Sequence, residues 1–214
     1  MSLEHRAKFC LACDCVIFSY ANRTLNVALI ARNKPPFVGQ WALPGGFVEA
    51  HETIDEGAQR ELEEETGISH TVLESFGTYS KVDRDPRGRV ISIGFMALVD
   101  PNAHRLMASG DAAKVAWVNI KELPTLAFDH SEILADALRH LQEGIQIRPI
   151  GLCLLPSEFT LSSLQELYET ILDVAMDKRN FRKKVSRMPF VVSTGKKQTG
   201  QANRPAELYR FVKS

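Results

Sequence analysis

Residues 45–68 read GGFVEAHETIDEGAQRELEEETGI, and this stretch decides the fold that we expect for the chain. Thr53 can cap the start of a helix, and Gly67 is a natural residue for the helix C-terminus. Between them, apolar residues recur at every fourth position, as one buried helical face requires. The stretch therefore predicts a helix that is entered through a glycine-rich turn and packs on a core through Ile54, Ala58 and Leu62.

Three glutamates lie beside the apolar face of this helix. Glu61, Glu64 and Glu65 stand at positions i, i+3 and i+4, so their carboxylates share one flank. Like charges at this spacing repel and call for a compensating cation, although a glutamate-rich run taken by itself is more often a solvated face. Mg²⁺ (or Mn²⁺) takes oxygen ligands and is usually held by a few carboxylates together with substrate phosphates. The flank is thus a candidate metal site.

The complete spacing resembles the signature of the Nudix hydrolases. It runs from Gly46 over five residues to Glu52, then over seven residues to Arg60-Glu61-Leu62, and on through Glu64-Glu65 to Gly67-Ile68. The resemblance implies an α/β/α sandwich with a mixed sheet and cleavage of a diphosphate attached to a nucleoside. Carried over by position, it makes Glu61, Glu64, Glu65 and the Gly45 carbonyl metal ligands, Glu61 or Glu64 a catalytic base, and Glu52 with Arg60 the brace of the loop.

A second polar stretch, residues 81–89, carries three arginines. A guanidinium fork suits a diphosphate, and Asp83 or Asp85 could orient such forks. On spacing alone, a solvated hairpin loop explains the stretch equally well. However, KVDRDPRGRVISI resembles Nudix domains that act on or sense ADP-ribose. The candidate substrate-binding residues are therefore Arg32, Gly46, Arg84, Arg87 and Arg89.

Composition places the chain among globular proteins. It has 214 residues, of which 44% are hydrophobic and 24% charged. No apolar run is long enough to span a membrane and no signal pattern is seen, so we expect a cytoplasmic protein without a membrane partner. Net charge is zero, but residues 1–150 carry 15 Lys+Arg against 20 Asp+Glu and residues 151–214 carry 11 against 6. The two parts are expected to meet different partners.

The periodicity predicts two domains, at 1–148 and 149–214. In the first, strands are expected at 9–20, 25–31, 72–82 and 90–99, with a helix at 128–143 before a linker at 144–151. In the second, two helices within 160–188 precede two strands, at 190–193 and 208–212, that flank a basic tip.

This second layout is typical of a winged helix-turn-helix domain that binds double-stranded DNA, with its basic helix in the major groove. A solvated basic face or a dimer contact is the alternative. The candidate DNA-binding residues are Lys178, Arg179, Asn180, Arg182, Lys183, Arg187, Lys196 and Lys197.

The domain order resembles the Nudix-related transcriptional regulators of NAD metabolism. FTLSSLQELYE, MDKRNFRKKV and RPAELYRF carry this resemblance beyond the first domain. It implies a homodimer that binds ADP-ribose or a related nucleotide, can hydrolyse ADP-ribose to AMP and ribose 5-phosphate, and binds an operator. Two alternatives remain open: a non-catalytic regulator that senses a ligand of NAD or sugar metabolism, and a hydrolase whose C-terminal domain serves dimerisation.

Overall fold

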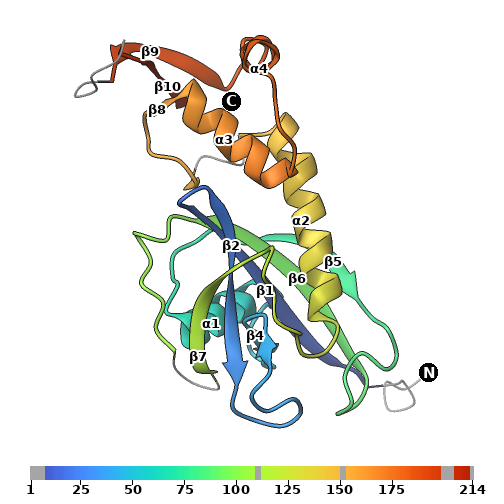
Figure 1. The fold of residues 1–214 in the computed structure, drawn as a ribbon. Coiled ribbons are helices and arrows are strands. Elements are labelled where there is room, and N and C mark those ends of the chain that lie inside the picture. Colours follow the sequence, from blue (N-terminus) through green and yellow to red (C-terminus); the bar gives the residue numbers. More distant parts are fainter. Residues whose placement is uncertain (1–7, 109–111, 150–152, 199–204, 213–214) are drawn as a thin grey trace.

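The computed structural model describes residues 8–108, 112–149, 153–198 and 205–212. A large domain built on a sheet occupies the N-terminal part of the chain, and a smaller domain follows it (Figure 1). Within the described residues, no helix is both long and apolar enough to cross a bilayer.

The large sheet is centred on strand β1 (Cys10–Ala21). β1 pairs in parallel with β6 (Val90–Val99) and antiparallel with its other neighbours, so the sheet is mixed, as predicted. The pairing order is β3-β2-β1-β6-β5, while β4 pairs with β1 and β7 with β2. The remaining strands are β2 (Thr24–Arg32), β3 (Trp41–Ala42), β4 (Gly45–Phe47), β5 (Glu74–Tyr79) and β7 (Ala112–Asn119).

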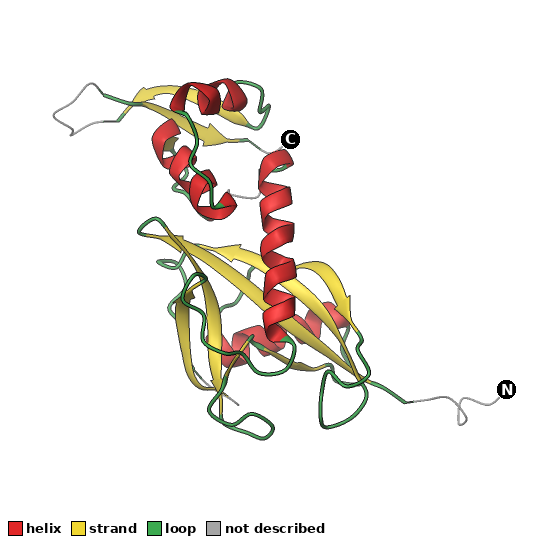
Figure 2. Ribbon diagram, turned by 45° about the vertical axis from the view of Figure 1, so that its right-hand side comes forward, coloured by secondary structure: helices red, strands yellow, loops and turns green. Residues whose placement is uncertain are grey.

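Helices cover both faces of this sheet (Figure 2). Side chains alternate along a strand. The buried Cys13, Cys15 and Ile17 of β1 therefore pack with α1 (Ile54–Thr66), whereas Val16 and Phe18 share a core with α2 (His130–Ile147). The result is a three-layered sandwich with one core on each side of the sheet.

Helix α2 is longer than the sequence predicted. It continues through Gly144 to Ile147, whereas the expected helix ended at residue 143. Ile145 lies four residues after Leu141, so it extends the buried apolar stripe by one more turn, and both side chains are buried in the same core. The expected linker is correspondingly shorter.

The small domain contains α3 (Leu161–Leu172) and α4 (Lys178–Val185) beside a sheet with the order β8-β10-β9. Its strands are β8 (Phe159–Thr160), β9 (Val191–Lys197) and β10 (Glu207–Phe211). β9 extends beyond the predicted end at residue 193 and carries Lys196 and Lys197, because its pairing with β10 continues as far as Glu207. The predicted tip between the strands lies partly outside the described residues.

Candidate active site and DNA-binding surface

Helix α1 has defined caps at both ends. The Thr53 side chain accepts a hydrogen bond from the Glu56 backbone N–H, and the Glu56 carboxylate accepts one from the Thr53 N–H at 2.8 Å. At the other end, Gly67 has a φ of +74°, which glycine adopts at little cost, and its N–H bonds the Glu63 carbonyl. The predicted start and stop are confirmed, and they fix the helix that carries the glutamates.

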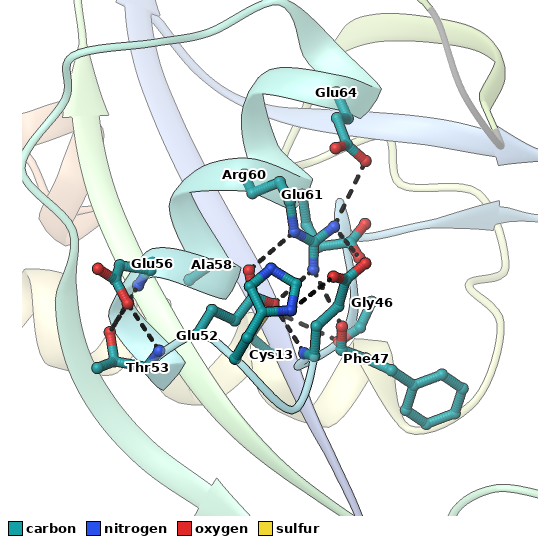
Figure 3. Close-up of polar contacts among 12 residues, drawn as sticks. Cys13, Gly46, Phe47, Glu52, Thr53, Glu56, Ala58, Arg60, Glu61 and Glu64 are labelled. Carbon is teal, nitrogen blue, oxygen red and sulfur yellow. Dashed lines mark hydrogen bonds and ion pairs between the residues drawn. The ribbon is translucent and has the colours of Figure 1, made fainter.

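Arg60 joins this helix to the preceding loop (Figure 3). Its Nε and Nη2 donate to the two Glu52 oxygens at 2.9 and 2.7 Å, and Nη2 also donates to the Phe47 carbonyl at 3.1 Å. Hydrogen bonding from Arg60 lowers the pKa of Glu52 to about 2. A Cβ at Gly57 would stand 2.8 Å from a Glu52 oxygen, so the glycine makes room for this carboxylate.

The three glutamates of the flank differ in their surroundings. Arg60 Nη1 donates to Glu61 at 2.8 Å and to the more exposed Glu64 at 3.4 Å. Glu65 is buried and accepts the Gly45 N–H at 2.8 Å. Burial raises the pKa of Glu61, although Arg60 opposes the shift. In this structure, part of the charge repulsion between Glu61 and Glu64 is therefore compensated by Arg60.

The donor chemistry of this flank fits a hard divalent cation. Among the described residues, no three His, Cys, Asp or Glu side chains are arranged to hold a metal ion together. Yet the carboxylates supply the oxygen ligands that Mg²⁺ and Mn²⁺ prefer. A Cβ at Gly46 would lie 2.4 Å from a Glu61 oxygen, so a glycine at this position leaves room for the Glu61 carboxylate. A metal ion bound by all three glutamates would replace the Arg60 guanidinium as the cationic partner of Glu61 and Glu64.

A cavity of about 360 Å³ opens beside the glutamates. Glu61 and Glu65 lie on its wall with the glycine turn, and basic side chains also line it. The sequence-predicted site residues that line this cavity are Arg32, Gly45, Gly46, Glu61, Glu65, Arg84 and Arg87. Glu64 and Arg89 are not among the residues that form its wall. The cavity thus brings carboxylates and guanidinium groups together around one space.

Arg84 is buried at this cavity and is held by two carboxylates. Its Nε and Nη2 donate to Asp129 at 2.8 and 2.7 Å, and Nη2 also reaches Asp14 at 3.1 Å. Asp14 accepts from Ser92 at 2.6 Å and contacts His130 Nε2 at 3.2 Å. Burial opposes ionisation of Asp14, but interactions with His130, Ser92 and Arg84 outweigh it and lower its pKa to about 2. The charges of this network are therefore paired.

Arg87 is positioned differently. Asp85 accepts two side-chain hydrogen bonds from Arg87 Nε, at 3.0 and 3.2 Å, and one from Nη2 at 2.6 Å. The guanidinium carbon lies 4.7 Å from the centre of the Phe47 ring and 5.5 Å from that of Phe128. Arg89 instead donates to the Lys81 carbonyl and contacts Phe9. Only two of the three loop arginines therefore reach the cavity.

Sequence reasoning missed the residues that hold Arg84. Asp14 carried a signal, because it is the one charged residue within the apolar run of residues 9–18. Asp129 carried none. These residues come together through the parallel register of β1 and β6, in which Asp14 pairs with Gly94, and through the start of α2.

The predicted DNA-binding residues of α4 lie on its solvent side. Asp177 caps the helix by accepting from the Arg179 and Asn180 N–H groups, and Phe181 and Val185 are buried. The exposed residues are Lys178, Arg179, Asn180, Arg182 and Lys183 of α4, Arg187 just after this helix, and Lys196 and Lys197 of β9. Arg182 and both β9 lysines line a groove between α4 and the strands.

Two lysines of this domain have partners within the chain. Lys184 is half-buried, with its Nζ 5.3 Å from the centre of the Tyr168 ring. Lys196 pairs with Glu158 at 2.7 Å. The cationic surface is therefore carried mainly by the remaining side chains of α4 and by Lys197.

Comparison with known families gives a match in each domain. The NUDIX domain matches residues 8–141, and the NrtR DNA-binding winged helix domain matches residues 151–211. The chain is 34% identical over 203 residues to the ADPR responsive transcriptional repressor NtrR of Acinetobacter baylyi, which covers 93% of this chain and 80% of the repressor.

Two further proteins are similar to this chain. The ADP-ribose pyrophosphatase of Methanocaldococcus jannaschii is 47% identical over 113 residues, or 53% of this chain and 66% of the enzyme. The crystal structure of Shewanella oneidensis NrtR complexed with a 27mer DNA has a TM-score of 0.78 at 30% identity and covers 94% of this chain and 93% of that one. Together these similarities confirm the predicted combination of a sandwich domain and a winged helix domain.

Proposed function

The chain belongs to the Nudix family and carries the NrtR DNA-binding winged helix domain, and from this premise we propose that it is a transcriptional regulator that binds and hydrolyses ADP-ribose. The observation that carries the proposal is the cavity in which Glu61 and Glu65 share a wall with Arg84 and Arg87. Such a space accommodates a metal at the carboxylates and the anionic groups of a diphosphate beside the guanidinium forks. We further propose a cytoplasmic homodimer that binds operator DNA.

The chemistry assigned to the large domain is cleavage of the diphosphate to give AMP and ribose 5-phosphate. Glu61, Glu64 and Glu65, with the Gly45 carbonyl, would hold Mg²⁺ or Mn²⁺, which when bound neutralises diphosphate charge and activates water. Arg84 and Arg87 would hold the substrate, since Asp129 and Asp85 already fix their forks. Glu61 or Glu64 would accept the proton from water.

A product assay tests the hydrolytic proposal. Purified chain with Mg²⁺ is offered ADP-ribose, NADH, diadenosine polyphosphates and sugar nucleotides, and AMP release is followed. We expect turnover of ADP-ribose and a loss of about 100-fold or more in Glu64→Gln and Glu65→Gln, since even residues that only support metal ligands are worth about 10- to 100-fold. Glu63→Gln is the matched control, because Glu63 is exposed on the same helix and outside the flank.

The assay also separates the alternatives. Binding of ADP-ribose without turnover would contradict hydrolysis and leave a sensor. Affinity for DNA is measured by selecting bound duplexes from a random library. Turnover without any affinity for DNA would contradict a regulatory role. The chain would then be a hydrolase whose second domain serves another purpose. Turnover that Glu64→Gln and Glu65→Gln leave intact would contradict the assignment of the glutamates.

A further inference from the structure

Helix α2 runs along the large sheet to the small domain (Figures 1 and 2), and its first residue, His130, lines the cavity. It has 18 residues, which corresponds to about 27 Å at 1.5 Å per residue. His130 in its first turn contacts Asp14 in the polar network of the cavity, and Ile145 in its last turn contacts α3. A single helix therefore joins the polar network of the cavity to α3, against which α4 packs.

The start of α2 is fixed by two residues. Asp129, at the N-terminal boundary, accepts two hydrogen bonds from Arg84. The next residue, His130, accepts the Leu43 N–H at Nδ1 over 2.9 Å. The other ring nitrogen, Nε2, faces Asp14 at 3.2 Å. The helix start is thus tied to β1 and to the turn before β4.

Arg84 can also contact a ligand. It lines the cavity, and its hydrogen bonds in the described part of the chain all come from Nε and Nη2. The Nη1 donors are left for an anionic group. A phosphate that attracts the guanidinium therefore acts directly on the side chain that holds the start of α2.

The end of α2 is joined to the winged helix domain by buried contacts. The Tyr168 hydroxyl of α3 donates to the Ile145 carbonyl at 2.5 Å, and Gln142 donates to the Ile171 carbonyl at 2.9 Å. The Tyr168 ring packs edge-on against Phe181 of α4 at 5.5 Å. Displacement of the last turn of α2 would therefore be passed through α3 to the basic helix.

Two ion pairs between described residues of the two domains lie at the surface. Arg23 pairs with Glu166 at 2.6 Å, and Lys121 pairs with Asp173. Exposed pairs contribute little because water and salt screen them. They can exchange partners when the domains shift, whereas the buried Tyr168 contact keeps its geometry.

We propose that the pair Arg84–Asp129 and the contact of Tyr168 with Ile145 are the two ends of one coupling element, helix α2, through which an occupied cavity changes the affinity of α4 for DNA. This inference rests on the proposed function and adds its route. Asp129 and Tyr168 act as positioning residues: neither lines the cavity or belongs to the basic surface. Coupling energies between sites correspond to about 5- to 150-fold in affinity.

The test measures operator affinity with and without ligand. The α,β-methylene analogue of ADP-ribose resists cleavage, and the duplex is one selected by the wild-type chain. We expect the analogue to change wild-type affinity by a factor within about 5- to 150-fold. In Tyr168→Phe, which loses only the hydroxyl, that factor should fall by about five-fold or more, while affinity for the analogue alone and for DNA alone stays near wild type.

Tyr79→Phe is the matched control, because the Tyr79 hydroxyl also contacts α2, at Asp136, but at neither end of the helix. If Tyr168→Phe does not fold, Gln142→Met removes the half-buried donor to Ile171 instead. An unchanged coupling factor in a folded Tyr168→Phe or Gln142→Met variant would overturn the inference and leave the proposed function standing. A wild-type chain that fails to bind the analogue would instead overturn the proposed function.

Discussion

At the scale of single residues, Asp14 shows how burial and pairing compete. The carboxylate is buried within β1, which disfavours its charge. Contacts from His130, Ser92 and Arg84 more than compensate, so its pKa falls from 3.8 to about 2. A buried charge with this many partners is costly to leave unpaired, and it fixes Arg84 beside the cavity.

The lowered pKa of Asp14 predicts a pH dependence of stability. Its contribution is fully present above the unfolded-state pKa of 3.8 and is lost as the pH falls through about 2. The difference corresponds to about 2 kcal/mol, of which roughly half should be gone at pH 3. Urea unfolding between pH 7 and pH 3 should therefore show wild type and Asp14→Asn approaching each other at low pH. A gap that stays constant over this range would contradict the assignment, and Asp55→Asn, on the exposed side of α1, is the control.

At the scale of elements, local sequence signals were sufficient to predict α1 but not to predict the polar network around Arg84. Thr53 and Gly67 mark the helix ends through backbone chemistry that acts within four residues. Asp14, Arg84 and Asp129 instead meet through contacts between residues 45 and 70 positions apart. Such contacts depend on strand register and on where α2 begins, and neither follows from periodicity. Helix α2 was predicted too short for another reason: Gly144 was taken as the start of a linker, although Ile145 continues the apolar stripe of Leu141.

Alanine substitutions at the two glycines of the turn before α1, Gly45 and Gly46, are expected to affect stability differently. Gly45 has a φ of +149°, and a Cβ there would stand 2.1 Å from the Cys13 carbonyl oxygen, which belongs to the backbone of β1. Gly45→Ala must therefore separate β4 from β1, and we expect a loss of more than about 3 kcal/mol of unfolding free energy. The three atoms nearest to a Cβ at Gly46 all belong to the Glu61 carboxylate, the closest at 2.4 Å, and this carboxylate can rotate away.

Gly46→Ala should thus keep nearly wild-type stability and lose metal affinity, because it displaces a proposed ligand. Thermal unfolding measures the first effect, and Mn²⁺ titration followed by electron paramagnetic resonance measures the second. If both variants lost the same amount of stability, the conformation of the turn, and not the close contact with β1, would determine the cost of a side chain at both positions.

At the scale of the whole molecule, charge divides along the domain boundary. Residues 1–150 carry five more acidic than basic residues, and residues 151–214 carry five more basic than acidic ones. The acidic part contains the flank proposed to bind metal, and the basic part contains α4 and β9. An anionic duplex is therefore attracted to one end of the molecule and repelled by the other, which favours a single binding orientation.

This orientation predicts how salt affects DNA binding. Each phosphate neutralised by a lysine or arginine lowers the slope of log affinity against log salt by about 0.9. Lys183 is exposed on α4, so Lys183→Ala should weaken binding and make the slope shallower by about that amount. Its neighbour Lys184 packs over Tyr168, so Lys184→Ala should leave the slope unchanged even if it lowers stability. Fluorescence anisotropy with a selected duplex between 50 and 200 mM salt measures both slopes. Equal slopes in Lys183→Ala and wild type would place the DNA on another face of the small domain, since the neutralised phosphate could not then be one that Lys183 contacts.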